Sequence, residues 1–232
     1  MDNAARTRQR VLALFLPIAA VLYISAEALS PKGTDQVITT TATALNVLSI
    51  AARHPAQLYV AGSCALFGPG ALAVSYAAIA ALVRGRGSAL ATVAALIGGI
   101  GAFCGAITNV LVYPNLAAAT AHLTPAAAAR FLVTTFNSGF GQVFLYAYFI
   151  GQYVAPVLMG YALWRSRSVP RWLAALFVIG LYVAEIQSSG GAIVVLYMLP
   201  FAAAMVLLAA RIWQAAALPA SQPQPEPANV PA

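Results

Sequence analysis

The sequence predicts an all-α protein, a multi-pass transmembrane helical bundle with six spans and with short interfacial helices on the outer side. Hydrophobic residues make up 62% of the 232-residue chain and charged residues only 7%, whereas a soluble domain carries about a quarter charged residues. The apolar residues gather in six runs long enough to cross a bilayer, and the basic residues stand in short clusters between these runs. The lipid bilayer is therefore the expected surrounding of most of the chain.

The six apolar runs fall near residues 11–29, 57–83, 88–113, 142–164, 172–189 and 191–213. A span needs about 20 residues, at a rise of about 1.5 Å per residue, to cross a hydrocarbon layer about 30 Å thick. Lipid cannot satisfy exposed backbone groups, so each run is expected to be a helix. The fifth run is the shortest of the six.

The basic residues indicate the orientation of the chain. Nine of them fall on one side of the predicted spans: Arg6, Arg8, Arg10, Arg84, Arg86, Arg165, Arg167, Arg171 and Arg211. The other side has Lys32, Arg53 and Arg130. Because basic loops stay in the cytosol, both termini are expected to be cytosolic. The net charge of +7 is interpreted as topology-setting charge and not as a nucleic-acid surface.

The six-span domain is expected at 11–213, between a basic cytosolic N-terminus at 1–10 and a Pro-rich, disordered cytosolic tail at 214–232. The abundance of Arg and Ala favours a bacterial protein, placed in the cell (inner) membrane. The first span also resembles a signal peptide with small residues at its end. A retained span is favoured, because the apolar run is long for a signal core.

Two long outer loops are predicted to carry short interfacial helices, at 30–56 and 114–141. In the first loop, Leu45, Leu48 and Ala52 recur at helical spacing. In the second, Thr124 and Pro125 form an N-cap and first-turn pair ahead of an Ala-rich apolar segment.

Proline occurs in four of the predicted spans, at Pro17, Pro69, Pro156 and Pro200. One interpretation is a set of broken helices around a transport site in the middle of the membrane. The other is ordinary kinking, which is favoured because proline is well tolerated in spans.

Small residues within the spans predict close packing. Gly101 and Gly105 form a GxxxG pattern, which indicates contact with another helix of the bundle. Cys64 and Cys104 show no metal-binding spacing and are interpreted as small buried hydrophobic residues, with a disulfide between them as the alternative.

The sequence has no HExxH, GxSxG, SxxK, P-loop or dinucleotide-binding motif. His54 and His122 both fall in the outer loops, away from any cluster that would hold a catalytic zinc ion, and no histidine stands in a span where it would bind haem. We assign no catalytic residue, metal or cofactor, and a non-enzymatic role is favoured over an enzymatic one.

Strongly polar residues of the spans gather toward the outer side. The inner halves have almost none before the terminal Arg clusters, whereas a transport path usually needs polar lining through the full depth. The pattern favours an outward-facing pocket above an apolar floor. The candidate ligand-binding residues are Glu27, Arg53, Asn109, Arg130 and Glu185. The arginines would serve as counter-charges to the carboxylates; simple solvation of the carboxylates at the interface is the competing interpretation.

Residues 158–180, LMGYALWRSRSVPRWLAALFVIG, join the fourth and fifth spans. The features of this segment that carry a resemblance to a known family are Gly160, Tyr161, Arg165, Ser166, Pro170 and Arg171. This junction resembles one in an uncharacterised bacterial family of six-helix membrane proteins, the domain of unknown function 4386, and the loop GTDQVITTTATALNVLSIAARH resembles the outer loop of that family. The resemblance implies a fold plan over most of residues 10–213 and carries over no activity.

Three functions compete. The favoured one is non-enzymatic binding of a small amphipathic ligand, or of a membrane protein partner, from the outer side. The midplane prolines support a small-solute transporter or channel instead. A membrane-embedded, lipid-modifying enzyme would need Glu27 or Glu185 as acid or base, close to a second titratable group. The oligomeric state is left open.

Overall fold

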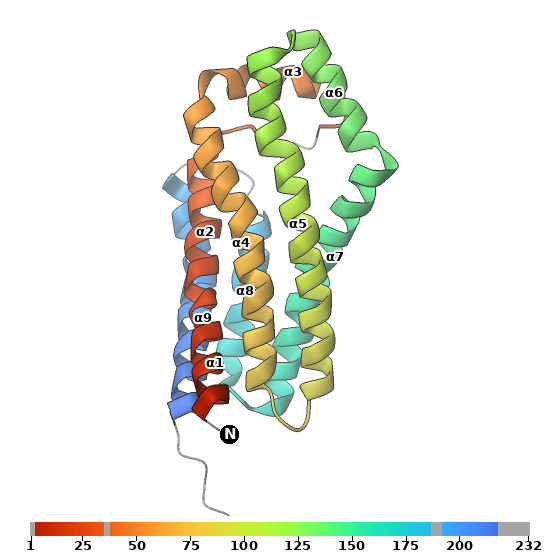
Figure 1. Ribbon diagram of the computed structural model, residues 1–232. Coiled ribbons are helices and arrows are strands. Elements are labelled where there is room, and N and C mark those ends of the chain that lie inside the picture. Colours follow the sequence, from red (N-terminus) through yellow and green to blue (C-terminus); the bar gives the residue numbers. More distant parts are fainter. Residues whose placement is uncertain (1–2, 35–37, 187–191, 218–232) are drawn as a thin grey trace, which may run out of the picture.

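The computed structural model describes residues 3–34, 38–186 and 192–217, and this part of the chain is helical with short connections (Figure 1). The helices are α1 (Asn3–Ala13), α2 (Phe15–Leu29), α3 (Thr41–Arg53), α4 (Pro55–Leu82), α5 (Ser88–His122), α6 (Pro125–Asn137), α7 (Gly139–Ser166), α8 (Arg171–Ile186) and α9 (Ala192–Ala217). The described ranges contain no strand, so the predicted all-α class is confirmed.

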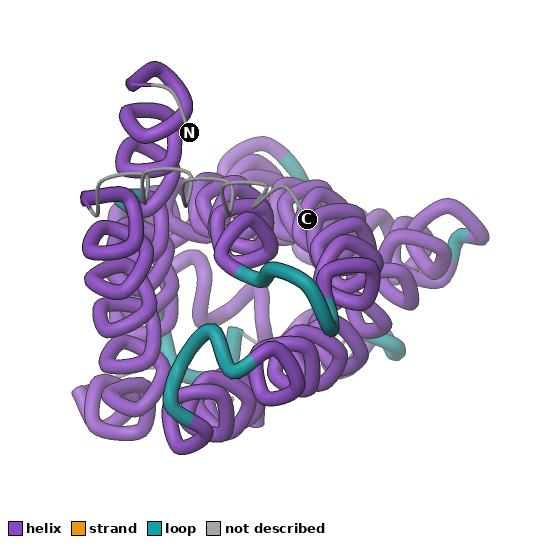
Figure 2. Tube along the Cα trace, turned by 90° about the horizontal axis from the view of Figure 1, so that it is seen from below, coloured by secondary structure: helices purple, strands orange, loops and turns teal. Residues whose placement is uncertain are grey.

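The long helices stand side by side around one apolar core, as the view along the bundle shows (Figure 2). Its bulkiest fully buried side chains include Tyr76, Phe177 and Phe201. Tyr76 meets Phe177 edge to face with ring centroids 6.2 Å apart, and Tyr23 meets Phe201 in the same way at 5.9 Å. Such pairs contribute about 0.5–1.5 kcal/mol each beyond the burial of their area, and they tie α2 and α4 to α8 and α9.

The outside of the bundle is also apolar. Phe67, Phe103 and Val143, on three different helices, are 64%, 64% and 66% exposed. A soluble protein rarely leaves so much apolar surface in water. Five helical stretches of the described chain are long and apolar enough to cross a membrane: Ala4–Leu29, Pro55–Leu82, Ser88–Asn109, Gly139–Ser166 and Ile193–Ala217. These features are those of a multi-pass membrane protein.

The fifth predicted span, at 172–189, corresponds to α8. This helix has 16 residues, so it is about 24 Å long at about 1.5 Å per residue. A hydrocarbon layer is about 30 Å thick, which makes α8 short for a full crossing. Residues 187–189 lie outside the described ranges, and the sixth span stays a prediction.

The first predicted span is interrupted at Leu14, between α1 and α2. Pro17 explains the interruption, because proline has no N–H to donate to the carbonyl of Ala13 and its ring crowds that carbonyl. At the junction the Leu14 N–H donates to the Val11 carbonyl, three residues back, at 3.2 Å, which forms a single tighter turn of the 3₁₀ type. The helices that contain Pro69, Pro156 and Pro200 continue without interruption.

The structure corrects the end of the third span. The sequence suggested that a loop begins at residue 114, but α5 remains helical through Pro114 and ends at His122. Its 35 residues correspond to a length of about 52 Å, well beyond the thickness of the hydrocarbon layer. A single proline removes one backbone hydrogen bond, and the turns on either side sustain the helix.

Two short helices, α3 and α6, pack on each other and against the N-terminal end of α4 and the C-terminal end of α5 (Figure 1). We call α3, α6 and these adjoining helix ends the helical cap. It has an apolar core of its own, separate from that of the bundle. Each predicted outer loop thus contains a short helix, while the interfacial placement on the outer side stays a prediction. Thr124 caps α6 by accepting a hydrogen bond from the Ala127 N–H at 3.4 Å, with Pro125 in the first turn.

The predicted apolar face of α3 is partly wrong. Leu48 is buried, but Leu45 and Ala52 are exposed, and Ala44 and Ala51 are fully buried in their place. The buried face of α3 consists of Ala44, Val47, Leu48 and Ala51, so the helical spacing was right but the face is turned by about one residue from the predicted one.

The two ends of the chain also differ from the prediction. The helix α1 begins at Asn3, so most of the basic segment at 1–10 is helical. The helix α9 continues to Ala217, so residues 214–217 of the predicted disordered tail are helical as well. The rest of the tail, 218–232, lies outside the described ranges.

Candidate ligand-binding site

Asn109 is bound to the backbone of a neighbouring helix. Its side-chain amide donates a hydrogen bond of 2.7 Å to the carbonyl oxygen of Ala65 on α4. Ala65 stands four residues before Pro69, which has no N–H, so this carbonyl lacks its usual donor within the helix. Asn109 supplies the missing donor. The predicted ligand-binding residue therefore has a structural role that the sequence alone did not reveal.

The two candidate arginines lie on the helical cap. Arg53 is exposed at the end of α3, and its Nε donates to the Ser49 carbonyl of the same helix at 3.1 Å. Arg130 is exposed on α6. The amide of Asn137 at the end of α6 donates to the Thr39 carbonyl at 3.4 Å, so the start of α3 and the end of α6 are joined. The cap thus holds both arginines on one compact unit.

The two candidate carboxylates belong to the bundle. Glu27 is half-buried in the last turn of α2. Glu185 belongs to the last turn of α8, and its side chain lies outside the described part of the structure. The convergence of the five candidate residues on one cavity stays a prediction, with Asn109 already engaged by the Ala65 carbonyl.

A small cavity lies where α5, α6 and α7 meet. Its lining includes Thr108, Thr135 and Phe136, and its volume is about 10 Å³. One water molecule occupies about this much space, so this cavity is too small for an organic ligand.

A polar cluster at the middle of the bundle was not singled out from the sequence. Gln152 is 3% exposed, and its amide donates to the hydroxyl oxygens of Tyr23 at 3.2 Å and Tyr148 at 3.5 Å. At the next residue of α7, the Tyr153 carbonyl accepts a hydrogen bond of 2.6 Å from the Tyr182 hydroxyl. These residues come from α2, α7 and α8, so pairing depends on helix packing that no local motif encodes. The signal that was available is Gln152, a strongly polar residue near mid-membrane.

The end of the bundle opposite the cap is basic and carries aromatic anchors. The guanidinium of Arg10 lies 5.7 Å from the ring centre of Trp213, and that of Arg171 lies 5.1 Å from the ring centre of Trp164. Cation–π pairs of this kind contribute about 0.5–1 kcal/mol at exposed sites. They join α1 to α9 and α7 to α8 at the end where the sequence places the inner boundary.

The described part of the chain holds two cysteines and no cluster of metal-binding side chains. No group of three or more His, Cys, Asp or Glu side chains there is close enough to hold a metal ion. Cys64 and Cys104 are both free, which agrees with their interpretation as small hydrophobic residues.

Compared with models of known protein families, with curated proteins and with solved structures, the chain matches none.

Proposed function

We propose that this chain is a six-span protein of the bacterial cell (inner) membrane, with both termini in the cytosol, that binds a small amphipathic ligand from the outer side. Binding occurs at the helical cap and requires no chemical step. The resemblance to the uncharacterised six-helix family belongs to the same proposal, since it rests on the short junction at 158–180 and on the loop at 33–54.

The observation that carries the proposal is the packed apolar core at the basic end. Ile79, Leu163, Leu173 and Leu208 come from four helices, and each is at most 1% exposed. Each stands within about two turns of an arginine at the end of its helix or in the adjoining turn. A solute would have to cross this layer to pass through the bundle, and the layer offers no polar lining. This arrangement supports binding on the cap side over transport.

The form of the cap supports a binding role. Its core is built from α3 and α6, which are too short to cross a bilayer, together with residues of α2, α4 and α5. Exposed loops and elements held on a rigid scaffold carry function disproportionately. Arg53 and Arg130 lie on this unit, and Glu27 lies near the end of α2 on the same side of the bundle core. Basic and acidic groups together suit a zwitterionic amphiphile.

Transport is the second candidate, and the polar cluster of Gln152, Tyr23 and Tyr148 favours it. Polar groups inside a bundle often mark a solute path. Against it, the helices through Pro69 and Pro200 are unbroken, whereas transporter sites typically use interrupted helices.

The test compares two double variants that remove the same charge from opposite ends. The full-length protein in lipid nanodiscs is titrated with a fluorescent lysophosphatidylcholine. Arg53→Gln with Arg130→Gln is expected to weaken binding about tenfold, the equivalent of about 1.4 kcal/mol. Arg165→Gln with Arg211→Gln, both exposed at the basic end, should bind as the unmodified protein does.

A swelling assay with glycerol-loaded liposomes separates the two candidate functions. Binding without transport predicts no swelling above that of empty liposomes. Equal affinities of the two double variants would contradict the cap as the binding site. Protein-dependent swelling would favour the transporter.

A further inference from the structure

A second recess lies at the basic end, between α1 and the end of α4. It is an open groove with a volume of about 630 Å³. The residues that matter for its chemistry are Arg8, Gln9 and Leu12 of α1, with Ala77, Ala81 and Arg84 from α4 and the turn that follows it. We call this recess the basic groove. It is distinct from the helical cap, because α1 and the C-terminal end of α4 lie at the opposite end of the molecule (Figure 1).

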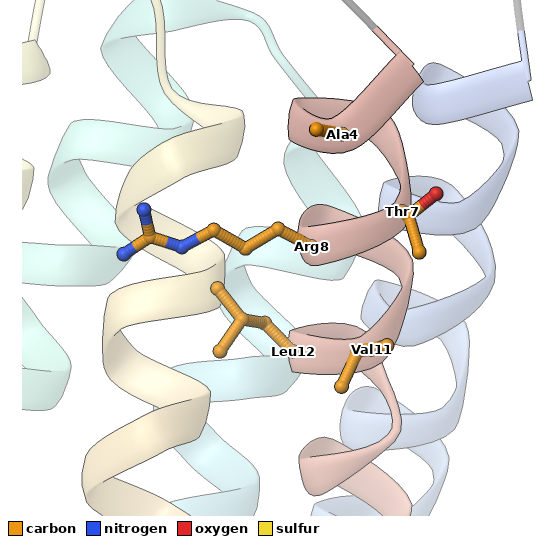
Figure 3. Close-up of a pocket in the computed structure, with 5 residues that line it drawn as sticks. All are labelled: Ala4, Thr7, Arg8, Val11 and Leu12. Atoms are coloured by element: carbon orange, nitrogen blue, oxygen red, sulfur yellow. The ribbon is translucent and has the colours of Figure 1, made fainter.

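The groove is basic at its rim and apolar along its wall. Arg8 and Leu12 are one turn apart on α1 and project to the same side of that helix (Figure 3). Ala77 and Ala81 are likewise one turn apart on α4 and are exposed. A charged rim above two apolar stripes matches a molecule with an anionic head and an alkyl chain. A free inorganic anion would have no use for the apolar wall.

Gln9 adds an observation that is independent of the charges. Its side chain is 7% exposed and lines the groove, yet it forms no hydrogen bond within the described ranges. The amide atoms of Gln9 are not among the fully buried side-chain atoms without a partner, so the amide reaches the open space of the groove. An oxygen acceptor in the groove would satisfy the amide. The groove thus presents two guanidinium groups and one amide donor to the same space.

The charge around the groove favours an occupant with a net negative charge. Arg84 and Arg86 flank the turn after α4, and Arg6, Arg8 and Arg10 all belong to α1. The acidic residues of the described ranges, Glu27 and Glu185, lie toward the other end of their helices. Asp2 lies outside the described residues.

We propose that the basic groove binds an acidic membrane phospholipid. The guanidinium groups of Arg8 and Arg84 hold the phosphate, since arginine donates to phosphate oxygens in a bidentate way. The Gln9 amide donates to a further oxygen of the headgroup, and the first part of an acyl chain lies along Leu12, Ala77 and Ala81. This site goes beyond the ligand proposed for the cap, and it requires only that the bundle be embedded in lipid.

The experiment measures the melting temperature of the delipidated full-length protein in a neutral detergent. Dioctanoyl phosphatidylglycerol is expected to raise this melting temperature, and the shift is expected to saturate as the lipid concentration increases. Arg8→Gln with Arg84→Gln should need at least about tenfold more of this lipid for half of the shift, because both guanidinium contacts to the phosphate are lost. Arg165→Gln with Arg211→Gln removes the same charge from exposed positions of the same end and should behave as the unmodified protein does.

Gln9→Leu is the second variant, and it separates binding from folding. It keeps most of the buried volume and removes the amide, so the melting temperature without lipid should be unchanged or higher. The concentration of phosphatidylglycerol at half shift should nonetheless rise severalfold. A lower melting temperature without lipid, together with an unchanged lipid response, would show that Gln9 serves packing only and would overturn its assignment.

Four results would overturn the proposal as a whole. The first is an equal response of the two double variants to phosphatidylglycerol. The second and third concern the unmodified protein: a melting-temperature shift with dioctanoyl phosphatidylcholine equal to that with phosphatidylglycerol, or the full shift with inorganic phosphate alone. The fourth is a loss of stability in Asp2→Asn that equals the loss in Arg8→Gln with Arg84→Gln. The last result would mean that the arginines bind the chain's own carboxylate. Because the two double variants differ only at the basic end, the comparison between them is independent of the ligand proposed for the cap.

Discussion

The bond between Asn109 and Ala65 shows how one side chain compensates for a proline in a neighbouring helix. Pro69 leaves the Ala65 carbonyl without its donor inside α4, and the Asn109 amide reaches it at 2.7 Å from α5. Little water is present inside a membrane bundle to take over this role. Pro69 and Asn109 therefore function as a pair, although they lie on different helices. Asn109 and Ala65, the residue whose carbonyl it binds, are 44 positions apart in the sequence.

Asn109→Ala is expected to lower the free energy of unfolding by about 1–2 kcal/mol, because it leaves the Ala65 carbonyl without a donor. Denaturant titration in detergent micelles measures this quantity. Thr108→Ala is the control at the neighbouring position. The Thr108 hydroxyl donates to the Cys104 carbonyl of its own helix, so its loss should cost no more than about 0.5 kcal/mol.

The pairing has a sharper consequence in the Pro69→Ala background. Alanine restores the N–H that donates to the Ala65 carbonyl, so Asn109→Ala should then cost at least about 0.5 kcal/mol less than it does beside Pro69. An equal cost in both backgrounds would show that Asn109 stabilises the bundle in some other way.

At the scale of helices, the crossing of α5 and α7 depends on two glycines. A Cβ at Gly101 would press against the backbone of Gly151, with the Gly151 nitrogen 3.1 Å away. A Cβ at Gly105 would likewise lie only 2.6 Å from Cδ2 of the Tyr148 ring. The sequence prediction that Gly101 and Gly105 face another helix is confirmed. Close backbone approach of this kind is a main source of helix adhesion in lipid.

Gly101→Leu should lower the free energy of unfolding by about 1–3 kcal/mol, since the added side chain forces α5 and α7 apart. Gly99→Leu is a matched control, because a Cβ at Gly99 meets no atom within 4 Å. It should be neutral or stabilising, since leucine favours a helix over glycine by roughly 0.5–1 kcal/mol. Equal effects of the two substitutions on the unfolding transition would contradict the crossing.

At the scale of the whole molecule, the sequence predicted what depends on local composition. The long apolar runs became helices because lipid leaves the backbone no other partner, and Thr124 with Pro125 began α6 as expected. The prediction from the sequence failed where a residue's role or burial depends on packing between distant segments. The role of Asn109 required knowing that α5 lies against Ala65, and the buried face of α3 depends on its fit to α6.

The basic groove was missed for a related reason. Arginines at the ends of spans were interpreted as topology-setting charges, which accounts for their side of the membrane but not for their mutual placement. Only the packing of α1 against the end of α4 brings Arg8 and Arg84 to one recess. The candidate outer site has the same dependence, since its residues come from five helices and Glu185 stands at the edge of the described part.

The central claim is a bundle of six spans with both termini in the cytosol, and α8 is its weakest element because it has only 16 residues. The most direct test is a pair of reporter fusions, one at Ser88, where α5 begins, and one directly after Ala217, where α9 ends. Six spans predict that both reporters are cytosolic. A cytosolic reporter at Ser88 with an external reporter after Ala217 would mean that α8 does not cross the membrane, and it would contradict the claim.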